Sequence, residues 1–184
     1  MPVGMLVGRV RGFDPRKVGS GNVGMTNVAR AGGRSAAAIT FSGDLLKGLI
    51  PVLIAKTAGL GPGALACVGF AAVAGSAASI FMGFSGGRGV STSFGVWLGL
   101  APAAAGIALA VFVAIVAIGR IVSLGSISAA IALAPAVAAT GSPRPYIMLA
   151  IAVSAVVLMR HRENIRRLIA GEEPKIGAGK KSPA

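Results

Sequence analysis

Long apolar runs alternate with short polar segments along the chain, and this pattern predicts a bundle of membrane-spanning α-helices. An apolar stub at 2–8 comes before a polar segment at 9–34. The apolar runs that follow occupy residues 35–58, 62–84, 90–119, 121–140 and 145–159. A polar, basic tail begins at residue 160.

The run at 90–119 is longer than the ~20 residues that one bilayer crossing needs. Pro102 and the small residues around it favour a tight helical hairpin, with spans near 90–100 and 103–118. We therefore predict an all-α, polytopic transmembrane helix bundle with six full spans and an N-terminal stub of a seventh. Residues 1–177 are expected to form one integral-membrane domain, followed by a disordered basic tail at 178–184.

Composition and charge agree with a membrane protein. Of the 184 residues, 54% are hydrophobic and 12% are charged, which is too few charges to cover a water-soluble fold. The net charge is +13, and 15 of the 18 Lys and Arg residues fall at 9–34, Arg88, Arg120 and 160–184. Alternating spans place these segments on one side, which the positive-inside rule identifies as the cytoplasmic side.

Several classes of protein and site are excluded. Aromatic residues make up 5% of the chain and are mostly Phe within apolar runs, so nucleic-acid binding lacks a stacking surface. Cys67 is alone in an apolar run, which predicts a small packing residue and no thiolate metal cluster. Residues 19–24 match G-x-G-x-x-G, with Asp44 further on, but the flanks are a charged loop and a membrane helix rather than a βαβ unit. No Gly-Lys-Ser/Thr follows to complete a Walker loop.

The segment 17–30, KVGSGNVGMTNVAR, is the most polar motif ahead of the spans. Glycines let backbone N–H groups approach a ligand, and Arg30 can hold a phosphate or carboxylate in a two-pronged fork. Residues 84–92 repeat this chemistry, with glycines, Arg88 and hydroxyls at the start of a helix. An anion site at a helix N-terminus is one interpretation, and a plain re-entrant turn is the other.

Ionisable residues in the spans allow two interpretations each. Asp44 and Lys47 lie on one helical face, either as an ion pair or with Lys47 reaching toward an anionic substrate. His161 is the only histidine and lies where the last span leaves the membrane. It is either a headgroup contact or a functional group, and Asn164 on the same helical face favours the second.

Five motifs occur in order along the chain: GSGNVGMTNVAR, DLLKG, GGRGVST, VSLGS, and HRENIRRL followed by GEEPK. Together they resemble the bacterial integral-membrane glycerol-3-phosphate acyltransferase family that uses acyl-phosphate as donor, over about residues 2–177. The resemblance implies transfer of an acyl group from acyl-phosphate to the sn-1 hydroxyl of glycerol 3-phosphate, giving lysophosphatidic acid and phosphate. This is the first step of phospholipid synthesis, in the bacterial inner membrane with the site facing the cytoplasm. We expect no cofactor, no metal, no nucleic-acid partner and a monomer among membrane lipids.

The resemblance also implies roles for individual residues. Ser20 and Arg30 match the family's catalytic serine and arginine. His161 and Asn164 match a second functional pair. The residues implied to bind substrate phosphate are Gly86, Gly87, Arg88, Gly89, Lys47, Asn22 and Asn27.

The resemblance also implies structural roles for two acidic residues, and the chain differs from the family pattern at several positions. Glu163 matches the family's structural glutamate in preference to Glu173, and Asp44 is given a structural role. Arg88 stands where the family usually has Lys, which keeps the cation but changes its geometry. Ser76 replaces a usual His, so a polar contact is expected to be lost. Seven spans are expected of the family, and a misplaced start codon is the simplest account of the stub.

Acyl-phosphate is a mixed anhydride, so phosphate can leave without strong acid assistance. We expect direct attack by the substrate hydroxyl, with Ser20 as a hydrogen-bonding positioner rather than a nucleophile. Either the donor's phosphate or His161 accepts the proton. The rival functions are a small organic-anion transporter and an inactive, lipid-binding relic of the family. Polar motifs that collect on one face rather than at the midplane argue against a transporter.

Overall fold

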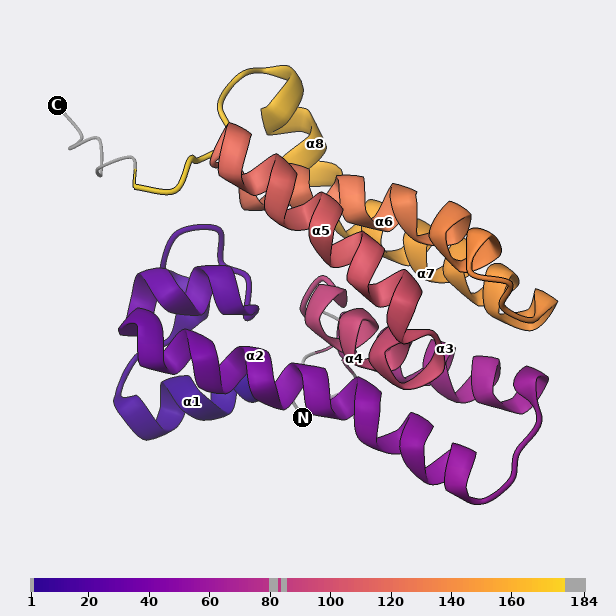
Figure 1. The fold of residues 1–184 in the computed structure, drawn as a ribbon. Coiled ribbons are helices and arrows are strands. Elements are labelled where there is room, and N and C mark those ends of the chain that lie inside the picture. The colour runs from indigo at the N-terminus through magenta and orange to yellow at the C-terminus, as the bar shows by residue number, and fades with distance from the viewer. Residues whose placement is uncertain (1, 80–82, 84–85, 178–184) are drawn as a thin grey trace, which may run out of the picture.

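The computed structural model describes residues 2–79, 83 and 86–177, and within these ranges the regular structure is helical, as predicted. Figure 1 shows the order of the helices from the N-terminus to the C-terminus. The elements are α1 (Val3–Arg11), a short 3₁₀ turn η1 (Pro15–Lys17), α2 (Met25–Thr57), α3 (Pro62–Ala77), α4 (Val90–Leu100), α5 (Pro102–Gly119), α6 (Val122–Ala139), α7 (Arg144–Arg160) and α8 (Arg162–Ile169).

Proline fixes where several helices begin. Pro62 and Pro102 are the first residues of α3 and α5, where the missing N–H costs no intrahelical hydrogen bond. The predicted break at Pro102 is confirmed, because α4 ends at Leu100 and α5 begins two residues later.

The first polar segment is more helical than the sequence predicts. Helix α1 continues to Arg11, and α2 begins at Met25, ten residues before the predicted start of the span. Gly33 interrupts α2 with φ 78° and ψ −176°, a conformation that favours glycine. Residues before Gly33 therefore form a separate helical piece, whose polarity alone had suggested a loop.

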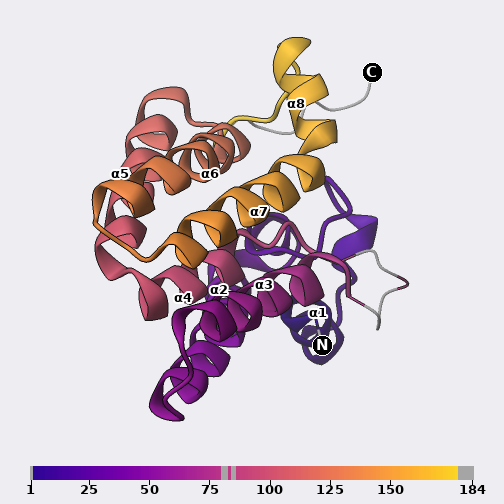
Figure 2. The ribbon, with the colours of Figure 1, turned by 90° about the vertical axis from the view of Figure 1, so that its right-hand side faces the viewer.

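Close backbone contacts hold the bundle together. A side chain at Gly48 would collide with the carbonyl of Thr92, and one at Gly95 with the carbonyl of Leu45, so α2 and α4 touch backbone to backbone. Gly99, four residues after Gly95, packs against Val52, as small residues do where membrane helices approach closely. The core around these contacts contains the buried side chains of Val52, Val96, Trp97, Val137 and Val153. Helices α5 and α6 pack against each other, α6 also packs against α7, and α3 lies on another side of α7 (Figure 2).

Length and composition do not confirm the predicted six full spans. Within residues 2–79, 83 and 86–177, three helices are long and apolar enough to cross a membrane, namely α2, α5 and α6, and α7 with α8 would make a fourth, bent by 62°. Helix α4 has 11 residues, about 17 Å at 1.5 Å per residue, against a hydrocarbon core of about 30 Å.

Three further predictions differ or lie outside the described ranges. The helix predicted at 62–84 ends at Ala77, and residues 80–82 and 84 are outside the described part of the chain. The predicted tail at 178–184 is also outside it. Cys67 is exposed on α3 instead of packed in the interior, because its face of the helix points outward.

Candidate active site

A cavity of about 690 Å³ lies where the polar segments meet the apolar helices. Along α4 its lining changes from Ser91 and Thr92 near the helix start to Trp97, and along α6 from Ser123 to Leu133. Along α7 the lining changes in the opposite order, from the apolar Val153 and Val157 to His161 at the end of the helix. The cavity thus has one polar part, built by loops and helix ends, that continues into an apolar part between helices.

Most of the sequence-predicted site residues lie on this cavity. They are Ser20, Asn22, Asn27, Arg30, Asp44, Gly87, Arg88, Gly89, His161 and Asn164. The structure thereby brings together residues that are more than 140 positions apart in the sequence. The remaining predicted residues, Gly86, Lys47 and Glu163, are not among the lining residues.

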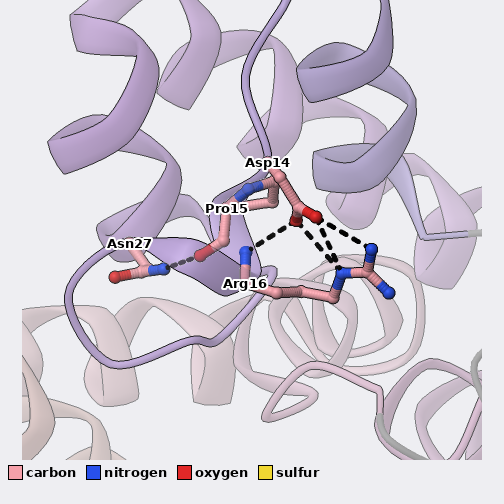
Figure 3. A network of polar contacts seen from close by, with 4 residues as sticks. All are labelled: Asp14, Pro15, Arg16 and Asn27. Carbon is pink, nitrogen blue, oxygen red and sulfur yellow. Dashed lines mark hydrogen bonds and ion pairs between the residues drawn. The ribbon is translucent and has the colours of Figure 1, made fainter.

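The loop before α2 is held by Asn27, whose side chain is 2% exposed. Its Nδ2 donates to the carbonyl of Pro15 at 2.7 Å (Figure 3). It also donates to the carbonyl of Asn22 at 2.8 Å. Its Oδ1 accepts from the backbone N–H of Ser20 at 3.0 Å. Both the oxygen and the nitrogen of the Asn27 amide are therefore bound to the loop backbone. These hydrogen bonds fit a structural role for Asn27 better than the predicted role as a phosphate ligand.

A second contact stiffens the entry of this loop. Asp14 accepts from the backbone N–H of Arg16 at 2.9 Å and from its guanidinium Nη2 at 2.8 Å (Figure 3). These hydrogen bonds lower the pKa of Asp14 to about 2. Further along, Gly19 adopts φ 57°, and a side chain there would meet Asn27 Oδ1 and the Arg30 side chain.

The loop at 86–89 leads into α4 and is held from two sides. The Gly87 N–H donates to the carbonyl of Ser76 at 3.2 Å, and Arg160 donates to the carbonyls of Gly86 and Gly87 at 2.8 and 3.2 Å. The hydroxyl of Thr92 donates to that of Ser76 at 2.9 Å. The polar contact expected to be lost at Ser76 is therefore supplied by its hydroxyl and carbonyl.

The start of α4 presents backbone donors beside a cation. Ser93 N–H makes the first intrahelical bond, to Gly89, so the N–H groups of the first turn have no earlier carbonyl of the helix to bond. Burial lowers the pKa of Arg88, and the charges of Arg167, Arg30 and Arg160 lower it further, while Glu173 opposes them. Guanidinium groups from four separate segments thus surround this point.

His161 ends α7 and is 1% exposed. Its Nδ1 lies 2.8 Å from the carbonyl of Val157. Because a carbonyl only accepts, Nδ1 carries the hydrogen and Nε2 is left as an acceptor. Burial lowers the pKa of His161 to about 4, the hydrogen bond to Val157 opposes this, and the Arg88 charge adds to it. The imidazole is therefore neutral at pH 7.

Glu173 joins the segment after α8 to the site. Its Oε1 accepts from the hydroxyl of Ser123 at 2.7 Å and from the Asn164 amide, and its Oε2 accepts from Arg167 Nε at 2.7 Å. Burial alone would raise the pKa of Glu173, but these hydrogen bonds and the Arg167 charge outweigh it and lower the pKa. Asn164 Oδ1 is buried with no hydrogen-bond partner among the described residues.

The geometry does not fit the structural role predicted for Glu163. Its side chain is 56% exposed, and among the described residues it pairs only with Arg162 and Arg166 on the surface of α8. Glu173, instead of Glu163, connects Ser123 of α6 to Asn164 and Arg167 of α8. It reaches them because the chain after α8 returns to line the cavity. Sequence spacing favoured the glutamate within α8 and gave no sign of that return.

Lys47 and Asp44 form the ion pair that was one of the two interpretations, with Nζ 2.8 Å from Oδ1. Asp44 lines the cavity, whereas Lys47 is not among its lining residues. Sequence reasoning missed Arg160, Arg167 and Ser123 as site residues. All three lie in or beside the quoted motifs, so their positions were visible but their roles were not.

The site can hold an anion but shows no arrangement suited to a metal. Arg30, Arg88 and Arg167 line the cavity against the carboxylates of Asp44 and Glu173, and Asp44 is already paired. Within residues 2–79, 83 and 86–177, no group of three or more His, Cys, Asp or Glu side chains gathers as metal ligands would. Fold and site together define a helical membrane protein with a cavity whose cationic part continues into an apolar part.

Comparison with known proteins gives the family. The glycerol-3-phosphate acyltransferase family model matches residues 1–171, and the chain belongs to this family. It is 46% identical to a glycerol-3-phosphate acyltransferase of Geobacter sulfurreducens, over 97% of this chain and 92% of that protein. It is 44% identical to one of Rubrobacter xylanophilus, over 96% of this chain and 89% of that protein.

Solved structures agree. A crystal structure of PlsY, an integral membrane glycerol 3-phosphate acyltransferase, in its glycerol 3-phosphate form superposes with a TM-score of 0.92 at 40% identity, covering 96% of this chain and 88% of that one. The lysophosphatidic acid form of PlsY gives a TM-score of 0.89 at 39% identity, covering 95% and 87%. The chain is thus an integral-membrane protein of this fold.

Proposed function

We propose that this protein transfers an acyl group from acyl-phosphate to the sn-1 hydroxyl of glycerol 3-phosphate, releasing lysophosphatidic acid and phosphate. The observation that carries the proposal is the single cavity whose cationic part continues into an apolar part. A phosphate-bearing headgroup and an acyl chain need these two environments side by side. The substrate and product forms of the PlsY structures support the same pairing.

Glycerol 3-phosphate is proposed to bind at the start of α4. The N–H groups of its first turn and the Arg88 guanidinium suit a phosphate, because the helix dipole and the cation both favour negative charge there. Arg30 and Arg167 approach the same part of the cavity and would offset the repulsion between two phosphate-bearing substrates. Ser20 lines the cavity beside them as a hydrogen-bonding positioner.

The chemistry we propose is a direct displacement. The sn-1 oxygen attacks the acyl carbon, the new ester C–O bond forms, and the bond from the acyl carbon to the phosphate oxygen breaks. The hydroxyl proton goes to an oxygen of the departing phosphate. The phosphate oxygen gains negative charge as its bond to the acyl carbon breaks, so it becomes more basic during the step. Burial lowers the pKa of His161 to about 4, which makes the imidazole a weak base. The departing phosphate is therefore the better proton acceptor.

His161 and Asn164 are then proposed to orient the attacking hydroxyl. Both residues line the cavity, and the Nε2 of His161 is left as an acceptor there. The Oδ1 of Asn164 is itself buried, so its side chain must shift to accept from the hydroxyl. Fixed acceptors select the direction of the O–H bond and hold the oxygen for attack. We assign the structural role to Glu173, which keeps Asn164 and Arg167 in place.

We propose that the polar part of the cavity faces the cytoplasm of a bacterial inner membrane and that the protein acts as a monomer. Arg30, Arg88 and Arg167 meet at one cavity, and Arg120 bonds to the nearby C-terminal segment through Ile176. This gathers the basic residues of four segments on one side, in agreement with the positive-inside rule.

The decisive experiment uses purified protein, acyl-phosphate and labelled glycerol 3-phosphate. We expect labelled lysophosphatidic acid and one equivalent of inorganic phosphate. The absence of both products would refute the proposed activity. A radiolabelled acyl donor distinguishes the mechanism, since an acyl group trapped on Ser20 would replace direct displacement by an acyl-enzyme route.

A further inference from the structure

Arg160, the last residue of α7, contacts the phosphate-binding loop from behind. Its Nη2 donates to the carbonyl of Gly86 at 2.8 Å and its Nε to the carbonyl of Gly87 at 3.2 Å. The described lining of the cavity includes Gly87 and Arg88 but neither Gly86 nor Arg160. The guanidinium is thus bound to the loop's carbonyls on the side away from the cavity.

Peptide geometry says what this contact does. In a trans peptide the carbonyl of one residue and the N–H of the next point in opposite directions. The peptide after Gly86 follows this rule, because its carbonyl meets Arg160 while the Gly87 N–H donates to Ser76. The carbonyl of Gly87 is held in the same way, so the N–H of Arg88 points away from Arg160.

We propose that Arg160 is a positioning residue for the loop at 86–89. By binding two successive carbonyls, it keeps their negative ends out of the anion site and turns the Arg88 N–H toward the substrate phosphate. A carbonyl rotated toward a phosphate would repel it, so binding depends on this orientation. The inference rests on the proposed function, in that the ligand is taken to be the phosphate of glycerol 3-phosphate.

The alternative is that Arg160 contributes only its charge to a cationic site. Arg160→Lys separates the two, because an ammonium keeps the charge but cannot match two carbonyls with a rigid fork. We expect this variant to raise the KM for glycerol 3-phosphate at least about tenfold, equivalent to about 1.4 kcal/mol. We expect kcat and the KM for acyl-phosphate to stay within about twofold, since only one ground-state binding interaction is altered.

Arg162 provides a matched control. It is two residues away, its side chain is 79% exposed, and it pairs only with Glu163 among the described residues. Arg162→Lys and Arg162→Gln make the same changes of shape and charge without touching the loop. Both should leave the KM for glycerol 3-phosphate unchanged, whereas Arg160→Gln should raise it at least as much as Arg160→Lys.

Two readouts do not depend on turnover. Calorimetric titration with glycerol 3-phosphate should show weaker binding to Arg160→Lys by the same factor as the KM. Hydrogen–deuterium exchange should speed up in peptides covering 86–92 and not in peptides of α5. These readouts still test the loop if the wild-type protein binds glycerol 3-phosphate but forms no lysophosphatidic acid, a result that would refute the proposed function alone.

The inference is overturned by any of three results. The first is an Arg160→Lys variant with wild-type affinity and KM for glycerol 3-phosphate. The second is a parallel fall of kcat, both affinities and thermal stability, which would mark a purely structural role. The third is a wild-type protein that does not bind glycerol 3-phosphate. If Arg160→Gln fails to fold, Arg160→Lys and the exchange measurement decide.

Discussion

The buried carboxamide of Asn27 accepts a hydrogen bond from the backbone N–H of Ser20 at 3.0 Å. The same side chain donates to the carbonyls of Pro15 and Asn22. One residue at the start of α2 therefore ties down three points of the loop before it. The position of Ser20 on the cavity depends on these bonds, because the serine itself is exposed.

Asn27→Asp should destabilise this loop. A carboxylate keeps the bond from Ser20 but cannot donate to Pro15 and Asn22, and it places a charge beside two carbonyls. We expect a loss of about 1–3 kcal/mol for the unsatisfied buried groups, read as a lower melting temperature and faster proteolysis at 15–24. Asn22→Asp is the control, because Asn22 Oδ1 only accepts from Gly24. Equal stability of the two variants would contradict the scaffold role of Asn27.

Neighbouring glycines in the phosphate-binding loop should respond differently to alanine. A side chain at Gly87 would find only the Ser76 carbonyl, at 4.0 Å, so Gly87→Ala should fold normally. Its Cβ would occupy the cavity wall, which should raise the KM for glycerol 3-phosphate. A side chain at Gly86 would collide with the backbone carbonyls of Ser76 and Ala77, costing about 1–3 kcal/mol of stability. An unchanged KM in Gly87→Ala would refute the phosphate assignment of this loop.

Much of this site could be predicted from the sequence, and the rest could not for identifiable reasons. Apolar runs located most helices and the Pro102 break because both depend on local composition. The bounds of α4 also agree with the predicted run near 90–100. The helical piece at 25–32 that carries Arg30 was not predicted, since its polar composition near a cavity resembles that of a loop. Glu173 and Arg160 also escaped, because their roles depend on which backbone groups the tertiary fold brings within reach.

Arg30→Ala should lower kcat/KM about 10²-fold or more, the effect of losing one preorganised charge-stabilising group. Arg30 lines the cavity and is packed against Gly19. Arg34→Ala provides the control, since Arg34 is exposed just after the Gly33 break of α2 and is not among the described cavity residues. Membrane fractionation and melting should show both variants inserted and folded. Near-normal turnover by Arg30→Ala would remove Arg30 from the site.

Glu173→Gln should lower the melting temperature at pH 7, whereas Glu163→Gln should not. The amide can neither pair with Arg167 nor accept as strongly from Ser123 and Asn164. Because the folded state lowers the pKa of Glu173, its stabilisation is present above the usual glutamate pKa of about 4.3 and is lost as the pH falls through the folded value. The difference in melting temperature between wild type and Glu173→Gln should therefore become smaller as the pH falls below about 4.3. A difference that becomes larger on acidification would contradict the proposed role of the Glu173 hydrogen bonds.

His161 should remain neutral throughout the pH range in which the enzyme works. It is the only histidine in the chain, so a single isotope-labelled imidazole signal reports on it without assignment. With the pKa lowered to about 4, the signal should not titrate between pH 8 and pH 5.5, whereas the denatured protein should titrate near 6.5. Since the unfolded state then binds more protons, stability should fall as the pH drops from about 6.5 toward 4. A midpoint near 6.5 in the folded protein would instead make His161 a competent general base and remove the argument for proton transfer to the phosphate.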